Sequence, residues 1–376
     1  FDRRVGVVSV GLLALSRFHV LHSQSARMYS LLTFGAVCSM YFLVRLHTRT
    51  TWSLWAGYVG ATVVTLTAHA FGVFVVAAQA VYLGLRVLLS DDDRMAMSLR
   101  GWLGAQVVAG LVAAPLGIGL VLQAITLSEG GDVNVGWIPE PTVMRVLTTV
   151  GSYLTPETAA IGLVTVSLSG VLLAIDGSRR SADGERSALV TLWVLLPIVG
   201  PLVLSYLLAP LFVARYTIAA VPGLFLGLAA TVRRTASVEI RYITLALLVV
   251  ALLSGLPGYY GQTAHPEWRA ATGVIEGNAT EDAIVVASER GVSNPVEFYL
   301  PEQGPTTVGV NESVTTARLN RTVEDRDQVW LVLSRVNEHN RSRLTDRLTA
   351  AEYRQQRSHS YHAVTVVQFT ANASRS

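Results

Sequence analysis

Long apolar runs dominate the first two thirds of the chain. Nine runs carry few charges: 5–22, 27–46, 52–69, 70–89, 99–127, 158–176, 187–208, 211–231 and 240–258. An α-helix of about 20 apolar residues is long enough to cross the hydrocarbon core of a bilayer. A signal peptide explains at most one such run. The pattern therefore predicts a polytopic α-helical membrane domain over residues 1–261, with about nine transmembrane helices.

The last third of the chain, residues 262–376, has a different pattern. Short apolar stretches alternate with polar ones there, and the stretches fall into two groups. Helical spacing occurs at 268–278 and 337–351, and strand-like runs occur at 282–288, 327–334 and 362–369. Strands that alternate with helices favour a small, mostly parallel sheet. The segment has no Gly-rich phosphate loop, so we expect a soluble accessory α/β domain.

The arginines predict which side of the membrane each loop occupies. The chain has no lysine, and its 29 basic residues are all arginine. Thirteen of the 17 in residues 1–261 fall on one set of alternating helix ends, against Arg17, Arg27, Arg145 and Arg215 on the other. Cytoplasmic loops carry the excess of basic residues. We therefore expect a multi-pass protein of the cell membrane that starts inside and has residues 262–376 outside.

Glycosylation sequons agree with this topology. The chain has eight asparagines, and five of them begin an Asn-x-Ser/Thr sequon: Asn278, Asn311, Asn320, Asn340 and Asn372. All five lie in the segment predicted to be outside. Such sequons are used on surface segments of exported proteins.

The composition limits the classes of partner and cofactor. The formal net charge of +3 is spread over loops, so it does not indicate a nucleic-acid surface. The single cysteine, Cys38, excludes an intrachain disulfide. No spacing of His, Asp and Glu predicts a metal site, although dependence on a divalent metal stays open.

Polar and aromatic side chains gather at the predicted outer ends of the spans. An ionisable group near a span is costly to place and is a functional candidate. The candidates are His22, Gln24, Arg27, Tyr29, His69, Trp137, Glu140, Arg215 and Tyr216. Arg27 and Arg215 both break the orientation bias, and a guanidinium fork can bind phosphate oxygens bidentately. The pattern indicates a cationic, outward-facing site at the depth of the lipid headgroups.

Each candidate also has a purely structural interpretation. Arg27 can extend its charge to lipid headgroups, and His69 can be an ordinary interfacial histidine. Tyr29 and Tyr216 can be packing or interface-belt residues.

The long segment 128–157 has two interpretations as well. Trp137 and two prolines constrain its path, and 142–154 is weakly amphipathic. These features predict either a helix in the membrane interface that forms a pocket wall, or a plain surface loop. Glu140 and Asp132 can assist at a site or can simply be solvated loop acids.

Several motifs, taken in order, resemble one family. The stretch "LSRFHVLHSQSARMYSLL" resembles the helix-loop-helix of polytopic GT-C glycosyltransferases of family 39, the protein mannosyltransferase and aminoarabinose transferase group. Gln24, Ala26, Arg27 and Tyr29 match its motif. Further similar segments are "TAHAFGVFVVAAQAVYL", "GWIPEPTVMRVL", "LFVARYTIAAVPGLFL" and "HPEWRAATGVI". The resemblance covers nearly the whole chain and implies a GT-C fold in an archaeal or bacterial protein.

The resemblance also implies an activity. Such enzymes transfer a sugar from a polyprenyl (dolichyl or undecaprenyl) phosphate to a protein, lipid or glycan acceptor outside the cytoplasm. An acidic residue in the first outer loop serves as the base. No matching acidic pair occurs before His22, so we expect the base upstream of residue 1, in an N-terminally truncated chain. Arg17 departs from the family pattern, where a small residue or proline is common.

Two other classes remain as alternatives. A secondary transporter would show inverted repeats and ionisable groups near the midplane, and neither is evident in this sequence. A membrane-anchored surface or binding protein without catalysis would leave the arginines at the outer helix ends unexplained.

Overall fold

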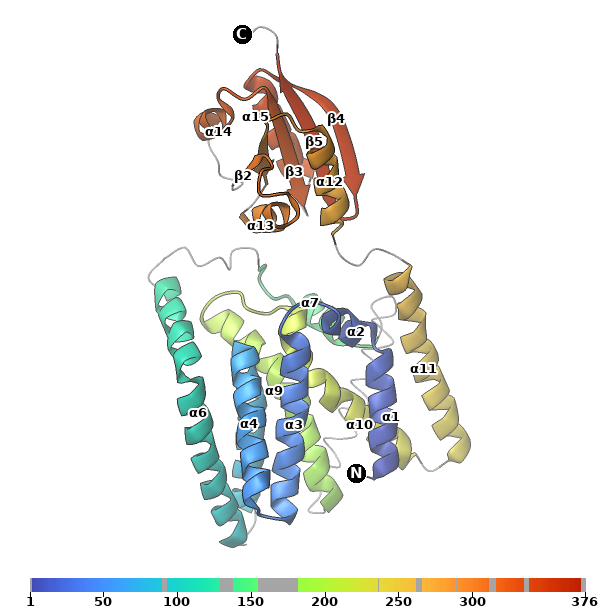
Figure 1. Cartoon of the computed structure of the whole chain (residues 1–376). Helices are drawn as coiled ribbons and strands as arrows, with labels where there is room; N and C mark the ends of the chain where they lie inside the picture. Colours follow the sequence, from blue (N-terminus) through green and yellow to red (C-terminus); the bar gives the residue numbers. More distant parts are fainter. Residues whose placement is uncertain are drawn as a thin grey trace. The chain divides into compact units, whose positions relative to one another are not determined.

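The chain divides into two compact units, Phe1–Tyr259 and Tyr260–Ser376. The computed structural model describes residues 2–89, 93–128, 138–154, 182–235, 237–261, 266–288, 290–310, 316–334 and 338–372. The first unit is helical and the second is built on a sheet (Figure 1). The sequence patterns place the boundary at 261/262.

The first unit is a bundle of long apolar helices. Its elements are α1 (Arg3–Leu15), α2 (Arg17–Ser23), α3 (Tyr29–Thr48), α4 (Trp52–Ala68), η1 (Ala70–Gly72), α5 (Val73–Leu89), α6 (Asp93–Ser128), α7 (Val143–Ser152), α9 (Ala182–Leu207), η2 (Ala214–Ala220), α10 (Val221–Arg234) and α11 (Val238–Tyr260). Within the described residues, six helices are long and apolar enough to cross a membrane, or seven if the bent pair α1–α2 is one span. The chain is therefore a multi-pass membrane protein.

Eight of the nine apolar runs fall on these helices, and the run 158–176 lies outside the described residues. Among the described residues, six or seven candidate spans stand against eight predicted runs, so the predicted count of nine is not confirmed. One reason is that α4 has only 17 residues, which is short for a membrane span. The predicted break at His69 is confirmed, because this residue has extended backbone between α4 and η1.

Two of the predicted runs are not single α-helices. Run 5–22 bends by 69° at Ser16. The Ser16 hydroxyl accepts a hydrogen bond from the His19 N–H at 3.3 Å and so caps α2. The same hydroxyl donates to the carbonyl of Tyr153 at 2.8 Å. Run 211–231 begins with the 3₁₀ segment η2 and becomes α-helical at Val221.

Close approach between helices depends on small residues, as at membrane helix interfaces generally. Helix α3 packs along α4, α5 along α9, and α1 along α10. At the first crossing, a Cβ on Gly35 would lie 2.7 Å from Thr65 Oγ1 and 3.0 Å from the Thr65 main-chain nitrogen. Only glycine permits this spacing between α3 and α4.

A buried polar network joins α3, α4, α5 and α6. The Tyr58 hydroxyl donates to Gln79 Oε1 at 2.5 Å and accepts from Trp102 Nε1 and Gln106 Nε2, both at 2.7 Å. Gln79 Nε2 donates in turn to Ser39 Oγ at 3.1 Å. Tyr58 and Gln79 are fully buried. A hydroxyl offers one donor and two acceptor sites, so Tyr58 uses its whole hydrogen-bonding capacity.

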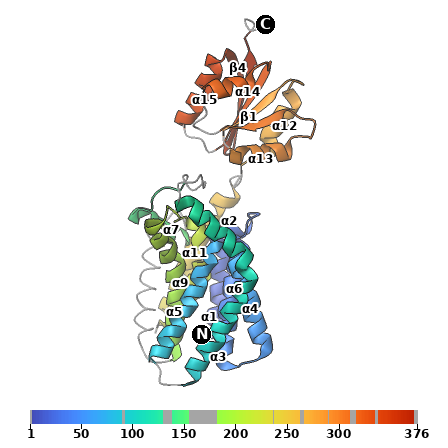
Figure 2. The same ribbon diagram turned by 90° about the vertical axis from the view of Figure 1, so that its left-hand side faces the viewer.

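The two ends of the bundle differ in their polar contacts. We call the end with α2 and α7 the α2 end, because both helices lie at this end of the bundle in two views (Figures 1 and 2). The opposite end holds two ion pairs, Arg86–Glu185 at 3.0 Å and Arg233–Asp2 at 3.4 Å. Asp2 accepts from the Val5 N–H, and this bond, followed by Arg233, holds the pKa of Asp2 below its usual value.

The second unit is a five-stranded mixed sheet with helices. Its elements are α12 (Trp268–Asn278), β1 (Ile284–Ala287), α13 (Arg290–Tyr299), β2 (Thr306–Gly309), α14 (Thr316–Val323), β3 (Gln328–Ser334), α15 (Glu338–Ala350), β4 (Tyr353–Tyr361) and β5 (Val364–Ala371). The strand order is β2-β1-β3-β5-β4. Strands β2, β1 and β3 are parallel, whereas β5 and β4 pair antiparallel.

The sequence expectation for this unit is partly confirmed. The three predicted strands correspond to β1, β3 and β5, and the two predicted helices to α12 and α15. Strands β2 and β4 were not predicted, and the sheet is half antiparallel rather than mostly parallel. Both missed strands lie at sheet edges, where one side of a strand has no neighbour and its side chains need not be apolar.

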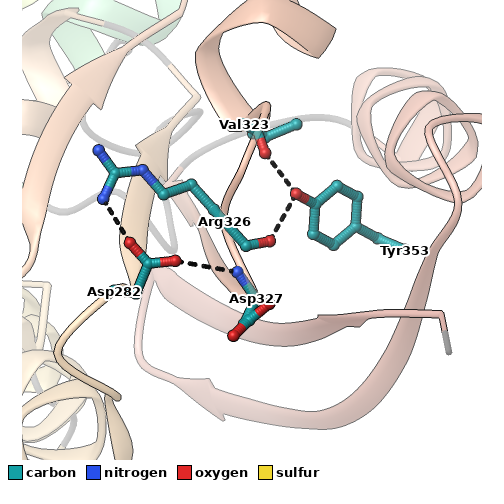
Figure 3. A network of polar contacts seen from close by, with 5 residues as sticks. All are labelled: Asp282, Val323, Arg326, Asp327 and Tyr353. Atoms are coloured by element: carbon teal, nitrogen blue, oxygen red, sulfur yellow. Dashed lines mark hydrogen bonds and ion pairs between the residues drawn. The ribbon is translucent and has the colours of Figure 1, made fainter. Parts of the chain in front are cut away.

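Polar contacts hold the loop between α14 and β3 against the sheet (Figure 3). Asp282 accepts from Arg326 Nη1 at 2.9 Å and from the main-chain N–H of Asp327 at 3.3 Å. The buried Tyr353 hydroxyl contacts the carbonyl of Val323 and that of Arg326, the second at 2.8 Å. These bonds satisfy main-chain groups of a turn that has no hydrogen bonds to a neighbouring strand of the sheet.

Candidate functional site

The bend at Ser16 shapes the α2 end of the bundle. Because α1 stops there, α2 turns away from the axis of α1 by 69°. A short turn follows, in which the Arg27 N–H donates to the Ser25 carbonyl at 2.7 Å. Helix α3 then begins at Tyr29. A span that would otherwise be continuous therefore presents residues 17–28 at this end.

A chain of ring contacts crosses the α2 end. Its members come from five segments of the first unit: α2, the start of α3, the α4–η1 junction, the end of α7, and η2. Ring centroids are separated by 5.0 Å for Tyr153–Phe18, 4.7 Å for Phe18–His22, 5.3 Å for His22–Tyr29, 6.0 Å for Tyr29–His69 and 4.9 Å for His69–Tyr216. We call these six residues the ring cluster. The separations are those of ordinary aromatic packing.

His69 has a defined tautomer within the ring cluster. Its Nδ1 accepts the main-chain N–H of Phe71 at 3.1 Å, which caps η1. An accepting Nδ1 leaves the ring proton on Nε2 in the neutral imidazole. The Phe71 ring also lies 5.3 Å from the Tyr216 ring, so both His69 and Phe71 pack against Tyr216.

Both candidate arginines lie near the ring cluster. The Arg215 guanidinium is 5.3 Å from the centroid of the Tyr216 ring, a cation–π distance. Arg215 acts electrostatically on both His22 and His69, and Arg27 acts on His22. Arg215 is half-buried and Arg27 is exposed. The charges of two arginines that lie 188 positions apart in the sequence thus both act on His22.

Hydroxyl groups fix the segments that carry the ring cluster. The Tyr153 hydroxyl is hydrogen-bonded to Thr217 Oγ1, and Thr217 also donates to the Ala214 carbonyl at 2.7 Å. Tyr153 and Thr217 are fully buried. With the bond from Ser16 to the Tyr153 carbonyl, the end of α7 is joined to both α2 and η2.

The structure brings together most of the predicted site residues. His22, Tyr29, His69 and Tyr216 share the ring cluster, with Arg27 and Arg215 beside it.

The remaining candidates lie elsewhere. The Gln24 side chain accepts from the Tyr259 hydroxyl at 2.5 Å, at the end of α11. Glu140 is exposed in the segment before α7, and Trp137 lies outside the described residues. The predicted helix within 142–154 is present as α7, and its residues Val143 and Met144 are strongly exposed.

Sequence reasoning did not identify Phe18, Tyr153 or Thr217. Phe18 sits in an apolar run, where it looks like any lipid-facing or core residue. Tyr153 and Thr217 have no local feature that marks them, because each hydroxyl finds its partner only in the folded bundle. A buried tyrosine hydroxyl needs such a partner, but the sequence does not show which tyrosine is buried.

The site is cationic and aromatic in its chemistry. Among the described residues, no group of three or more His, Cys, Asp or Glu side chains could hold a metal ion. Glu140, which is exposed, is the one acid among the described residues between α6 and α7. Arginines beside aromatic rings suit an anionic group such as a phosphate.

Comparison with known proteins yields structural likenesses but no sequence match. No family model and no curated protein matches the sequence. Among solved structures, the crystal structure of ArnT from Cupriavidus metallidurans in the apo state matches 98% of this chain and 79% of that chain. The sequence identity is 13% and the TM-score is 0.43. Similarity this low carries no information about activity.

Proposed function

We propose that the protein is a membrane glycosyltransferase of the GT-C type that uses a polyprenyl-phosphate sugar as donor. In this proposal the α2 end and the second unit face the outside of the cell membrane. Arg27 and Arg215 bind the donor phosphate, and the ring cluster forms the wall beside it. The acceptor is a protein, lipid or glycan at the same face.

The convergence of two arginines on one aromatic cluster carries the proposal. An ionisable group near a membrane face is a functional candidate, and a guanidinium fork suits a phosphate. Arg215 is half-buried beside Tyr216, and its charge and that of Arg27 both reach His22. A phosphate bound by both arginines would offset their positive charges. The family resemblance of residues 15–32 points to a lipid-linked phosphate as that anion.

In the proposed transfer step, each bond that forms is matched by a bond that breaks. The acceptor oxygen bonds to C1 of the sugar while the bond from C1 to the phosphate oxygen breaks. The acceptor proton passes to a general base, which the family resemblance implies is a carboxylate. Polyprenyl phosphate leaves, and the charge that it gains is stabilised by Arg27 and Arg215, as fixed cations stabilise leaving phosphates elsewhere.

Binding of the lipid phosphate tests the arginines without requiring catalysis. Polyprenyl phosphate is titrated into the purified chain in nanodiscs, and the dissociation constant is compared with those of Arg27→Ala and Arg215→Ala. A hydrogen bond to a charged group contributes about 1.5–3 kcal/mol. Each variant should therefore bind about tenfold to about a hundredfold more weakly. Arg215→Lys should fall in between, because lysine keeps the charge and loses the fork.

Arg49 supplies the matched control. It is an exposed arginine at the C-terminus of α3, at the opposite end of the bundle, so Arg49→Ala should bind like the wild type. Unchanged affinity in the Arg27→Ala, Arg215→Ala double variant would refute the phosphate site. Transport of a solute by the protein reconstituted into sealed vesicles, with no sugar transfer, would favour a transporter.

A further inference from the structure

The second unit is unusually rich in glycosylation sequons. Seven of the chain's eight asparagines lie in 262–376, and five of them begin a sequon. Serine and threonine occupy 21 of the 115 residues in this segment, so about one sequon among seven asparagines would arise by chance. The excess indicates that some of these asparagines are used as acceptors.

The structure distinguishes two of these sequons, which begin at Asn278 and Asn320. Asn278 is the last residue of α12, is exposed, and is followed by Ala279 in extended conformation. Thr280, the third residue of the sequon, is exposed as well. This sequon therefore sits where a helix gives way to a surface turn, as an acceptor site requires.

The turn that carries Asn278 is also held in place by its backbone. Gln328 Nε2 donates to the Asn278 carbonyl at 3.2 Å, and the Thr280 N–H donates to Gln328 Oε1 at 2.9 Å. These bonds leave the Asn278 amide on the surface, with one contact from Nδ2 to the Val274 carbonyl at 2.9 Å. A side-chain amide nitrogen has two hydrogens, so that contact uses one and leaves the other.

Asn320 provides the contrast. It lies inside α14 (Thr316–Val323), with helical residues on both sides, and is only half-exposed. Its Oδ1 atom is buried. A bulky glycan at this position would have to displace the packing of α14, whereas one at Asn278 would project from a helix end.

We infer that Asn278 is N-glycosylated and that Asn320 is not. A membrane-bound transferase that recognises Asn-x-Ser/Thr would move a glycan from a lipid-phosphate or lipid-pyrophosphate carrier. A bond forms between Asn278 Nδ2 and C1 of the first sugar, the bond from C1 to the carrier phosphate breaks, and Nδ2 loses one proton. The remaining hydrogen on Nδ2 is enough to keep the bond to Val274. The inference rests on the outward orientation of the second unit in the proposed function.

Glycopeptide mass spectrometry on the protein from the membranes of its source organism tests the inference. We expect a glycan mass on the peptide that contains Asn278 and the unmodified mass on the peptide that contains Asn320. Asn278→Gln and Thr280→Ala should abolish the modification, and Thr280→Ser should preserve it. Asn320→Gln is the matched control and should leave the glycan at Asn278 unchanged.

A second measurement separates orientation from modification. An Asn278→Cys variant in a Cys38→Ala background is treated in intact cells with a membrane-impermeant maleimide. Labelling from outside, together with an unmodified Asn278 peptide in the wild type, would overturn the glycosylation site and leave the topology intact. Labelling only after permeabilisation would overturn both. The lipid-phosphate titration reports on the function of the α2 end independently of either result.

Discussion

Tyr58→Phe offers a direct test of the buried network in the membrane bundle. The substitution removes one oxygen and leaves the ring and its packing in place. Three groups then lose their partner: the Gln79 carbonyl oxygen, the Trp102 indole N–H and one N–H of Gln106. Tyr58 and Gln79 are 0% exposed, so water cannot replace the lost bonds without entering the bundle.

The expected loss of stability depends on the unfolded state with which the folded bundle is compared: a chain in water, or separated helices in the membrane. An unsatisfied buried polar group costs about 1–3 kcal/mol in a soluble protein, which would give about 3–9 kcal/mol for three groups. Hydrogen bonds between membrane helices average only about 0.6 kcal/mol, because the separated helices also find partners. The second value governs here, since the network lies among membrane helices. We expect about 2 kcal/mol for Tyr58→Phe.

Reversible unfolding of the purified protein in mixed micelles, followed by tryptophan fluorescence, measures this difference. Gln79→Leu and the double variant complete a mutant cycle, and we expect a coupling of about 0.6 to 1.7 kcal/mol between the two side chains. Tyr242→Phe is the control, because Tyr242 is 67% exposed on α11. Additive effects of the two substitutions, or no loss with Tyr58→Phe, would refute the network.

Two further predictions concern packing and the second unit. Gly35→Ala should lower the unfolding midpoint in the same micelle assay, because its Cβ would lie 2.7 Å from Thr65 Oγ1, whereas Gly60→Ala, with open space around the added Cβ, should not. Tyr353→Phe leaves the Arg326 carbonyl without its hydroxyl donor, at a cost of about 1 kcal/mol. Amide exchange in the segment just before β3 should then become several-fold faster, and unchanged exchange would contradict the role of this bond.

Much of the membrane unit could be predicted from the sequence because a membrane helix satisfies its own backbone. Each span must be apolar along its length, and this pattern is visible locally. The bend at Ser16 was not visible, since serine is tolerated within helices. Its hydroxyl bonds to the carbonyl of Tyr153, which lies 137 positions away. Only the tertiary structure shows that 5–22 is two helices.

For the candidate site too, individual residues could be predicted from the sequence, whereas their assembly could not. Arg27 and Arg215 stood out because they oppose the charge bias, and His22 and His69 because imidazoles are rare in apolar surroundings. Their assembly into one cluster depends on the turn of α2 and on the position of η2, neither of which has a periodic signal. Strand β4 escaped prediction for a related reason: as an edge strand it has mostly exposed side chains, so its sequence is polar.

The bond between Tyr259 and Gln24 has a practical consequence. Tyr259 is the last residue of the first unit, and its hydroxyl is bonded to the turn that carries Arg27. Removing the C-terminal unit by cutting the chain before this tyrosine would therefore also free the end of α11 and loosen that turn. Loss of lipid-phosphate binding after such a cut would be misattributed to the missing unit. A cut placed after Tyr260 would retain the contact and separate the two effects.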